Sequence, residues 1–473
     1  MKPIVSPYNT FRFVSYDFDA DSGEASFVYG LDDEMTFTER IKFRIPDLTP
    51  ARSILDIVIG GVTAPRQDFA ELHRALFALH LMAGISYYKT YCPPNIVIES
   101  GELSVDEAAF WNKLYTHGLG EFFYKNDLDF RDYIHFPVGE GGKDQQNEKI
   151  HDSRSRVLAL RGDPLVGAIV PIGGGKDSLV TVELLQKAGF EFDLVALGRH
   201  ERIQEVADAI ALPLSIIERK LDPQLFELNK QGALNGHVPI SAYIAFTMVV
   251  HALLNGKRDI VLSNERSANT GNVMMGDLEI NHQYSKSLEC ERDIQTYIKN
   301  SITPKVRYFS LLRPLSELAI VKRFVEKGKY FEVFSSCNRN YAINKRATKR
   351  WCGECPKCAF VFTLLAAFMS KEDVTEIFDK NLFADESLLP TYKELLGLEG
   401  IKPFECVGEP DEVLAAFVLA QRRGDFAEDV IMRWFVTDIL PTKNNVEENI
   451  EEVLRPSNEQ AMPEEYTKLV YEN

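Results

Sequence analysis

A glycine-rich turn is the first place where this sequence could do chemistry. Three glycines precede a lysine, an acid and a serine: Gly173, Gly174, Gly175, Lys176, Asp177 and Ser178. Glycines let backbone N–H groups close around phosphate oxygens, and the first turn of a helix adds partial positive charge. The turn therefore predicts an anion-binding loop in which Lys176 and Asp177 take part in catalysis. A plain strand-to-helix turn is the alternative.

The spacing of the glycines separates this loop from two common nucleotide motifs. A Walker A loop needs a glycine where Val170 stands, and a dinucleotide fingerprint needs one where Ser178 stands. The loop instead resembles the S-G-G-x-D-S loop of the PP-loop ATP pyrophosphatases, although Gly173 replaces the first serine. The resemblance implies that Mg²⁺ assists and that the pyrophosphate end of ATP is held by Gly173, Gly174, Gly175, Asp177 and Ser178.

Four cysteines form a second group with chemical potential: Cys337, Cys352, Cys355 and Cys358. Thiolates at these spacings can surround one tetrahedral Zn²⁺, whereas buried thiols without a metal are the alternative. The surrounding pattern resembles the zinc loop of the 7-cyano-7-deazaguanine synthases, which implies a structural Zn²⁺. The remaining cysteines are scattered, which favours structural roles for Cys92, Cys290 and Cys406.

A polar, glycine-punctuated stretch follows the apolar run at 260–263. Glu265 and Asp277 could hold Mg²⁺ or accept a proton, and His282 is a further candidate acid or base. The stretch also supplies the candidate substrate-binding residues Arg266, Asn269 and Asn272. An exposed loop without a role is the alternative for this stretch, and a satisfied structural histidine is the alternative for His282.

Other segments could contact ligands. In the PP-loop superfamily, the position of Arg199 and His200 implies contact with the adenine and ribose of the nucleotide. Residues 118–126 combine aromatic and polar side chains, so they form either a ligand wall that includes Tyr124 or a packed aromatic cluster. A dense basic stretch is either a solvated loop or an anion site, and it consists of Arg339, Lys345, Arg346, Lys349 and Arg350.

Hydrophobic periodicity indicates the elements that position these residues. Alternating bursts between residues 11 and 45 predict an antiparallel sheet, followed by helices at 67–83 and 105–116 and a strand at 95–99. The polar segment 138–163 predicts a domain boundary. Beyond it, strands are expected at 165–172, 192–197, 214–217 and 260–263, with helices at 177–188, 202–211 and 241–254.

This alternation of strands and helices predicts a parallel sheet with right-handed crossovers. We therefore expect an α/β protein with three parts. Residues 1–150 form an N-terminal α+β domain, and residues 160–370 form a parallel, doubly wound PP-loop domain, similar to the adenine nucleotide alpha hydrolases, that carries the four-cysteine loop. Residues 371–473 form a helical, acidic C-terminal region.

The composition matches a globular protein, with 45% hydrophobic and 26% charged residues among 473. A formal net charge of −17 repels phosphate backbones, so nucleic acid is not an expected partner. The N-terminus lacks a signal pattern, and the longest apolar stretch, 240–254, is shorter than the roughly 20 residues of a membrane span. We expect a cytoplasmic protein without a membrane partner.

Several segments together carry a narrower resemblance, namely Thr10–Phe13, residues 173–178, Asn264–Asn269 and Trp351–Cys358. They resemble the bacterial UDP-N-acetylmuramoyl-L-alanyl-L-glutamate epimerases, over a span from residue 11 to about residue 368. This implies an ATP-binding isomerase of peptidoglycan synthesis, and thus of cell wall biogenesis, cell shape and cell division. Its substrate is a nucleotide-linked peptide.

In that family, ATP adenylates the α-carboxylate of the terminal L-glutamate and pyrophosphate leaves. The mixed anhydride delocalises charge toward an enolate, so Cα loses its proton more easily than in a free carboxylate. Proton return on the other face inverts the centre, and water frees AMP. Glu265, Asp277 and His282 are the candidate acid/base residues. A carboxylate-adenylating ligase that forms an amide or nitrile is the alternative, and a non-catalytic nucleotide sensor is another, which AMP formation would exclude.

Overall fold

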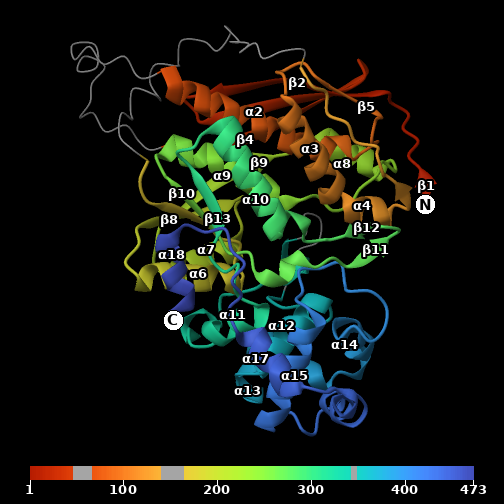
Figure 1. The fold of residues 1–473 in the computed structure, drawn as a ribbon, viewed down its shortest axis with the longest axis vertical. Coiled ribbons are helices and arrows are strands. Elements are labelled where there is room, and N and C mark those ends of the chain that lie inside the picture. The colour runs from red at the N-terminus through yellow and green to blue at the C-terminus, as the bar shows by residue number, and fades with distance from the viewer. Residues whose placement is uncertain (46–65, 140–164, 342–348, 473) are drawn as a thin grey trace.

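The computed structural model describes residues 1–45, 66–139, 165–341 and 349–472. A nine-stranded sheet crosses the molecule, helices cover it, and a helical region extends below it (Figure 1). In the described part of the chain, no helix is both long and apolar enough to cross a lipid bilayer. The chain is thus a mixed α/β protein with a helical C-terminal region, as predicted.

The parallel part of the sheet has the strand order β13-β10-β7-β8-β9. Its strands are β7 Ala168–Pro171, β8 Phe192–Leu197, β9 Leu214–Lys220, β10 Asp259–Leu262 and β13 Arg307–Ser310. The helices between β7 and β10 are α6 Lys176–Lys187, α7 Glu201–Ile210, α8 Pro223–Lys230 and α9 Ile240–Asn255. The predicted alternation is confirmed. The strand order runs outward from β7 in both directions, so β7 and β10 flank the switch point where open α/β sheets bind ligands.

The N-terminal strands extend this sheet. β2 Thr10–Asp19, β3 Glu24–Leu31 and β4 Met35–Lys42 form the predicted antiparallel meander, and β5 Asn95–Ile98 lies parallel to β2. β4 also pairs with β9 in antiparallel register, with Arg40 opposite Lys220. The predicted boundary at 138–163 lies mostly outside the described residues, and the sheet continues across it. Two short strands, β1 Lys2–Pro3 and β6 Leu128–Asp129, pair separately.

Helices cover both faces of the sheet because successive strand residues point to opposite sides. On β7, Ile169 packs into a core shared with α9 and with α2 Arg66–Tyr88, α3 Val105–Gly118 and α10 Leu288–Tyr297. Ala168 and Val170 face the other core, shared with α6, α7 and α11 Glu317–Phe324. Two more elements matter for the site: the helix α4 Gly120–Lys125 and the hairpin of β11 Val273–Met275 and β12 Leu278–Ile280.

The C-terminal region is helical, as predicted. After α12 Pro356–Ala366, which precedes this region, it contains α13 Lys371–Phe378, α14 Leu389–Leu395, α15 Pro410–Arg423, α16 Val430–Trp434, α17 Val446–Leu454 and α18 Glu464–Tyr471. The final helix returns to the sheet, since α18 lies beside α6 (Figure 1) and Tyr466 donates a 2.8 Å hydrogen bond to Asp259 at the start of β10. The Glu-rich end of the chain is therefore packed helix rather than a loose tail.

Candidate active site

The predicted anion-binding loop lies between β7 and α6, at the switch point of the sheet. Gly173 is exposed, with open space where a Cβ atom would stand. Gly174 has φ +87°, a conformation that favours glycine, and its carbonyl accepts a 2.9 Å hydrogen bond from Ser335 N. Gly175 precedes α6, and no side chain caps this helix. The first N–H groups of α6 therefore point to a place that an anion can occupy.

Two buried polar groups, one beside this turn and one just after β10, have no partner among the described residues. The Ser336 Cβ atom lies 3.6 Å from the position that a Cβ would take on Gly175, and its hydroxyl is buried and unpaired there. The side-chain amide nitrogen of Asn264, just after β10, is also buried and unpaired within the described chain. Both groups can donate a hydrogen bond to an anion. Ser336 supplies a hydroxyl beside a loop whose own first position is Gly173 instead of serine.

Lys176 lies in a buried group of charges beneath the loop. Its side chain is 1% exposed and forms close ion pairs with Asp177 and with Glu317, the first residue of α11. Glu317 also lies 3.4 Å from the ammonium of Lys357. Burial raises the pKa of Glu317, but the two lysines outweigh it and lower the pKa to about 2. The carboxylate is therefore charged at neutral pH. Glu317 was not predicted, because it lies in no recognisable motif, and Lys357, although it lies within the segment Trp351–Cys358, was given no role of its own.

Of the residues after β10, Glu265 joins this buried group. Thr181 of α6 and Ser263 share a 2.8 Å hydrogen bond, which ties α6 to the residue that follows β10. Burial raises the pKa of Glu265, whose carboxyl also lies within electrostatic range of Asp177 and Lys176. The structure thus brings Glu265, Lys176 and Asp177 together, as a shared catalytic site requires.

The predicted substrate-binding residues of this stretch contact the protein itself. Arg266 donates to the carbonyl oxygens of Val453 (3.3 Å) and Arg455 (3.2 Å) in the C-terminal region. Asn269 accepts a 2.8 Å hydrogen bond from Leu288 N. These contacts position main-chain segments, so any contact of Arg266 or Asn269 with substrate stays a prediction.

Asn272, His282 and Tyr124 gather around the segment 402–409, while Asp277 lies elsewhere. Asn272 donates to Pro403 O (2.8 Å) and accepts from His282 N (2.8 Å). The Tyr124 ring packs at 5.5 Å from a ring in the same segment, and the neighbouring Phe122 and Phe123 are fully buried. Asp277 is exposed in the turn between β11 and β12, where it faces Arg131. The structure does not bring Asp277 to the loop.

Arg199 and His200 follow β8, which pairs with β7. The Arg199 side chain is 76% exposed and pairs with Glu218 at 2.9 Å. His200 caps α7 by accepting a 3.2 Å hydrogen bond from Arg202 N. Both residues lie at the carboxyl edge of the sheet, and their nucleotide-binding role stays a prediction.

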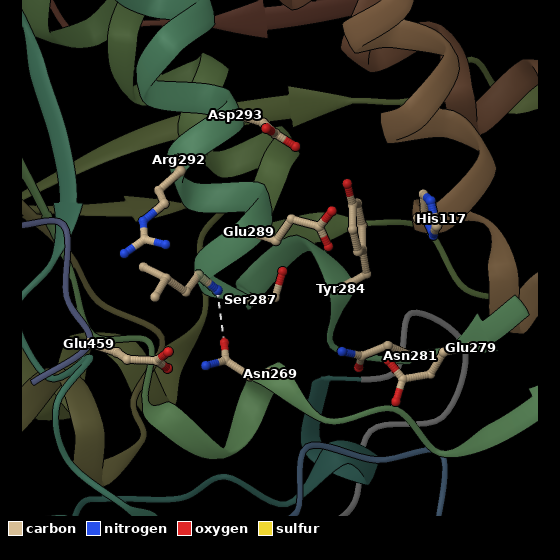
Figure 2. Close-up of a pocket in the computed structure, with 11 residues that line it drawn as sticks. His117, Asn269, Glu279, Asn281, Tyr284, Ser287, Glu289, Arg292, Asp293 and Glu459 are labelled. Carbon is tan, nitrogen blue, oxygen red and sulfur yellow. Dashed lines mark hydrogen bonds between the residues drawn. The ribbon is translucent and has the colours of Figure 1, made fainter. Parts of the chain in front are cut away.

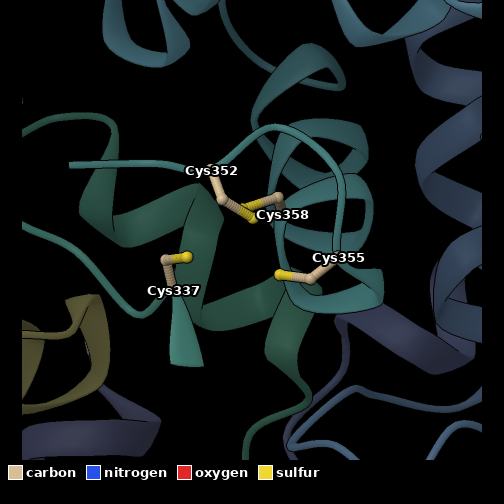
Figure 3. Close-up of side chains that lie close together, drawn as sticks. All are labelled: Cys337, Cys352, Cys355 and Cys358. Atoms are coloured by element: carbon tan, nitrogen blue, oxygen red, sulfur yellow. The ribbon is translucent and has the colours of Figure 1, made fainter. Parts of the chain in front are cut away.

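The four predicted metal ligands converge (Figure 3). The sulfur atoms of Cys337, Cys352, Cys355 and Cys358 all lie within 4.8 Å of one another, and all four are free thiols. Cys352 and Cys358 are 3.6 Å apart, close to the roughly 3.8 Å that two thiolates require around a tetrahedral Zn²⁺ with Zn–S bonds of about 2.3 Å. The donor set therefore fits a zinc ion.

The cysteine cluster and its flanking residues border the charged site. Lys357 lies between Cys355 and Cys358 in the first turn of α12, and it reaches Glu317 from there. In the basic stretch, Arg339 pairs with Glu354 (2.6 Å) and Arg350 pairs with Glu205 (2.9 Å). Lys345 and Arg346 lie outside the described residues. Arg339 and Arg350 therefore already have carboxylate partners, and neither alternative for this stretch, a solvated loop or an anion site, is decided by these pairs.

A separate pocket of about 420 Å³ lies beside α10 (Figure 2). Asn269 lines it, together with four acidic side chains: Glu279, Glu289, Asp293 and Glu459. Lys113 pairs with Glu289 and Asp293 at 2.7 Å each. Arg292 also lines the pocket, but the four carboxylates still outnumber Arg292 and Lys113, so the net negative charge disfavours nucleotide phosphates here. The glycine loop stays the better candidate.

Comparisons with known proteins agree over nearly the whole chain. The model of the MurL N-terminal domain matches residues 4–311, and that of the MurL C-terminal domain matches residues 333–450. A protein from Xanthomonas oryzae pv. oryzae is 40% identical over 456 residues, which cover 96% of this chain and 95% of the relative. A protein from Micromonospora sp. is 36% identical over 463 residues, covering 97% of each chain. Both carry the name UDP-N-acetyl-alpha-D-muramoyl-L-alanyl-L-glutamate epimerase.

Proposed function

We propose that this chain, which belongs to the family of UDP-N-acetyl-alpha-D-muramoyl-L-alanyl-L-glutamate epimerases, inverts the glutamate of that nucleotide-linked dipeptide. It would then be an isomerase that acts on a peptidoglycan precursor. The support is the match over nearly full length to relatives that carry this name. The proposed substrate is large and anionic, and the exposed Gly173 of the loop is where its reacting carboxylate would meet ATP.

The proposed reaction begins at residues 173–178. A glutamate carboxylate oxygen attacks the α-phosphorus of ATP, the bond to the bridging oxygen breaks, and pyrophosphate leaves. In the acyl adenylate, the electrons of the Cα–H bond can delocalise into the carbonyl group when a base removes the proton. A proton then adds to the opposite face. Water hydrolyses the anhydride and releases AMP with the D-glutamyl product.

The observation that carries the proposed reaction is the uncapped glycine turn, with the buried hydroxyl of Ser336 beside it. Backbone N–H groups of the turn would bind the outer phosphates of ATP, and the Ser336 hydroxyl would add a donor. Asp177 and Glu265 are the carboxylates that would hold Mg²⁺, which neutralises phosphate charge when bound. Lys176, buried against Glu317, holds the start of α6 in place.

We also propose a structural role for Zn²⁺ at the cysteine cluster. Cys337 follows Ser336, and Cys355 and Cys358 flank Lys357. A zinc ion held by these thiolates would therefore fix one donor beside the glycine turn and one ammonium beside Glu317. No catalytic step is assigned to this metal.

The test is an incubation with ATP, Mg²⁺ and the muramoyl dipeptide in D₂O. We expect AMP, D-glutamate and deuterium at Cα. The variant Asp177→Asn should form AMP roughly 100-fold more slowly, because the metal loses a ligand. Asp208→Asn on α7 is the matched control, since its exposed carboxylate contacts Gln204 at 2.8 Å, and it should keep full activity. Formation of ADP, or inversion without ATP consumption, would contradict the proposal. An amide product with AMP would indicate the ligase alternative.

A further inference from the structure

Cys406, His282 and Glu121 form a chain of contacts next to the loop region. The Cys406 sulfur lies 3.9 Å from His282 Nε2, and His282 Nδ1 forms a close hydrogen bond with Glu121 Oε2. The ammonium of Lys286 lies 3.4 Å from the same sulfur. A thiol beside an imidazole and an ammonium is a site that favours the thiolate, and the carboxylate behind the imidazole orients it.

Main-chain contacts hold these segments in register. Asn272 joins Pro403 O to His282 N, and the Gln283 amide donates to Val407 O at 3.2 Å. Pro403 and Val407, which lie on either side of Cys406 in the chain, are therefore both linked to the segment that carries His282. The thiol was expected to be structural, but its side chain is partly exposed, unlike the fully buried Cys92.

Electrostatics favour a charged thiol at neutral pH. Burial raises the pKa of Cys406, but Lys286 and His282 outweigh it and lower the pKa to about 6. Burial lowers the pKa of His282, but its contacts with Cys406 and Glu121 raise it to about 9. Burial raises the pKa of Glu121, yet the hydrogen bond with His282 brings it to about 2. The thiolate is thus stabilised by an imidazolium and an ammonium.

The same thiol belongs to the charged group beneath the glycine loop. Lys357 contacts the Cys406 carbonyl oxygen closely and lies 3.4 Å from Glu317, which pairs with the loop lysine. Lys286 lies within electrostatic range of both Cys406 and Asp177. Lys357 and Lys286 therefore connect the segment that carries the thiol to the charged residues beneath the loop, so a carboxylate activated at the loop would have a base nearby.

On the basis of the proposed function, we propose that Cys406 is the catalytic base that removes the Cα proton of the activated glutamyl group. The C–H electron pair moves into the acyl carbonyl group, and the proton moves to the sulfur to give the thiol. A proton from water adds to the opposite face of the enolate, and the thiol returns its proton to solvent. His282, Glu121 and Lys286 are positioning residues that hold the thiolate.

A divalent cation is the competing interpretation of part of this group, because ligand atoms of Glu121, His237 and His282 lie within 4.8 Å of one another. Lys125 pairs with Glu121 at 2.5 Å, and Lys286 lies 3.4 Å from the Cys406 sulfur that contacts His282, so two ammonium groups already lie close to this group. The hydrogen bond to Glu121 also occupies Nδ1 of His282, one of the two ring nitrogens through which this residue could bind a cation. These charges favour the thiolate.

The first test compares Cys406→Ala and Cys406→Ser with the wild type in D₂O. A positioned base contributes roughly 100- to 10,000-fold, so both variants should lose inversion and deuterium uptake by that factor. Both should still consume ATP and form AMP, since adenylation precedes proton removal. Cys290→Ala, which removes a thiol from the buried face of α10, is the matched control and should keep inversion. Inversion within threefold of wild type in Cys406→Ala would overturn the assignment. Failure of the wild type to form AMP would instead overturn the proposed function.

The second test measures thiolate formation without turnover. Alkylation of wild-type Cys406 by iodoacetamide, followed by mass spectrometry, should have a midpoint near pH 6. The ionisable groups that face the sulfur are His282, Lys286 and Lys357, and loss of one positive charge in His282→Gln should move that midpoint upward. An unchanged midpoint would exclude His282 as a positioning residue. Metal analysis that finds a second ion, lost in His237→Ala, would favour the cation instead.

Discussion

Replacement of Glu317 by glutamine tests the buried charge group that supports the loop. The carboxylate is 2% exposed and compensates Lys176 and Lys357, which are 1% and 5% exposed. A pKa lowered from 4.5 to about 2 corresponds to roughly 3 kcal/mol, at about 1.4 kcal/mol per pKa unit. Removing one partner of a buried pair costs about 3–5 kcal/mol. We therefore expect Glu317→Gln to lower the free energy of unfolding at pH 7 by about 3 kcal/mol or more.

Urea unfolding followed by circular dichroism measures this difference. The matched control is Glu218→Gln, which removes a carboxylate from a partly exposed pair with Arg199 and should cost below about 1 kcal/mol. The contribution of the Glu317 carboxylate to stability is fully present above pH 4.5 and is lost as the pH falls from there through about 2. The difference in the free energy of unfolding between the wild type and Glu317→Gln should therefore become smaller in acid. A cost equal to that of the control would refute the reasoning.

Three further outcomes are expected. Elemental analysis of the purified protein should find one zinc ion per chain at the cysteine cluster. The variant Cys355→Ser should lose both this ion and thermal stability. A wild-type protein without zinc would contradict the proposed zinc site. Burial lowers the pKa of His80 to about 3, so the unfolded chain binds a proton that the folded protein does not. The free energy of unfolding should therefore fall by about 1.4 kcal/mol per pH unit below pH 6.5. Urea unfolding at pH 5.5 and 7.5 should show that His80→Leu removes this pH dependence. Gly174→Ala forces alanine to φ +87° and should slow AMP formation, while similar AMP rates would show that the turn tolerates the change.

Local patterns were sufficient to predict the loop and the cysteine cluster. The turn at 173–178 lies between an apolar run and a helical pattern, and its residues are adjacent in sequence. The cysteines at 352, 355 and 358 lie within one turn and the start of one helix. Such sites can be predicted from a sequence because their residues are close together in the chain, so one turn or one helix start is enough to bring their side chains together. For the same reason, most strands of the parallel sheet were predicted within a few residues.

The remaining site residues could not be predicted because tertiary packing brings them together. Glu121 and Cys406 are separated by most of the chain and meet through His282. Glu317 is one of many acidic residues at a helix start, and only its burial against Lys176 distinguishes it. A sequence shows neither that burial nor the positive charge around a single cysteine.

Polar residues after β10 were predicted to contact substrate, and the structure shows what limits that inference. Arg266 and Asn272 both donate hydrogen bonds to carbonyl groups of the C-terminal region. A loop with many polar residues and glycines can bind a ligand or fasten another segment of backbone. Both kinds of loop have the same amino-acid composition, so a sequence cannot tell them apart, and only the structure shows whether another segment of the chain lies against the loop.

The antiparallel ladder between β4 and β9 has a mechanical consequence. Because Arg40, Ile41 and Lys42 pair with residues 218–220, the N-terminal meander and the parallel strands cannot swing apart without breaking hydrogen bonds inside one sheet. A hinge motion between the meander and the parallel strands would therefore have to break this ladder. Amide protons along this ladder should exchange with solvent only when the whole sheet unfolds, while those of residues 402–409 should exchange sooner if that segment lifts to admit substrate.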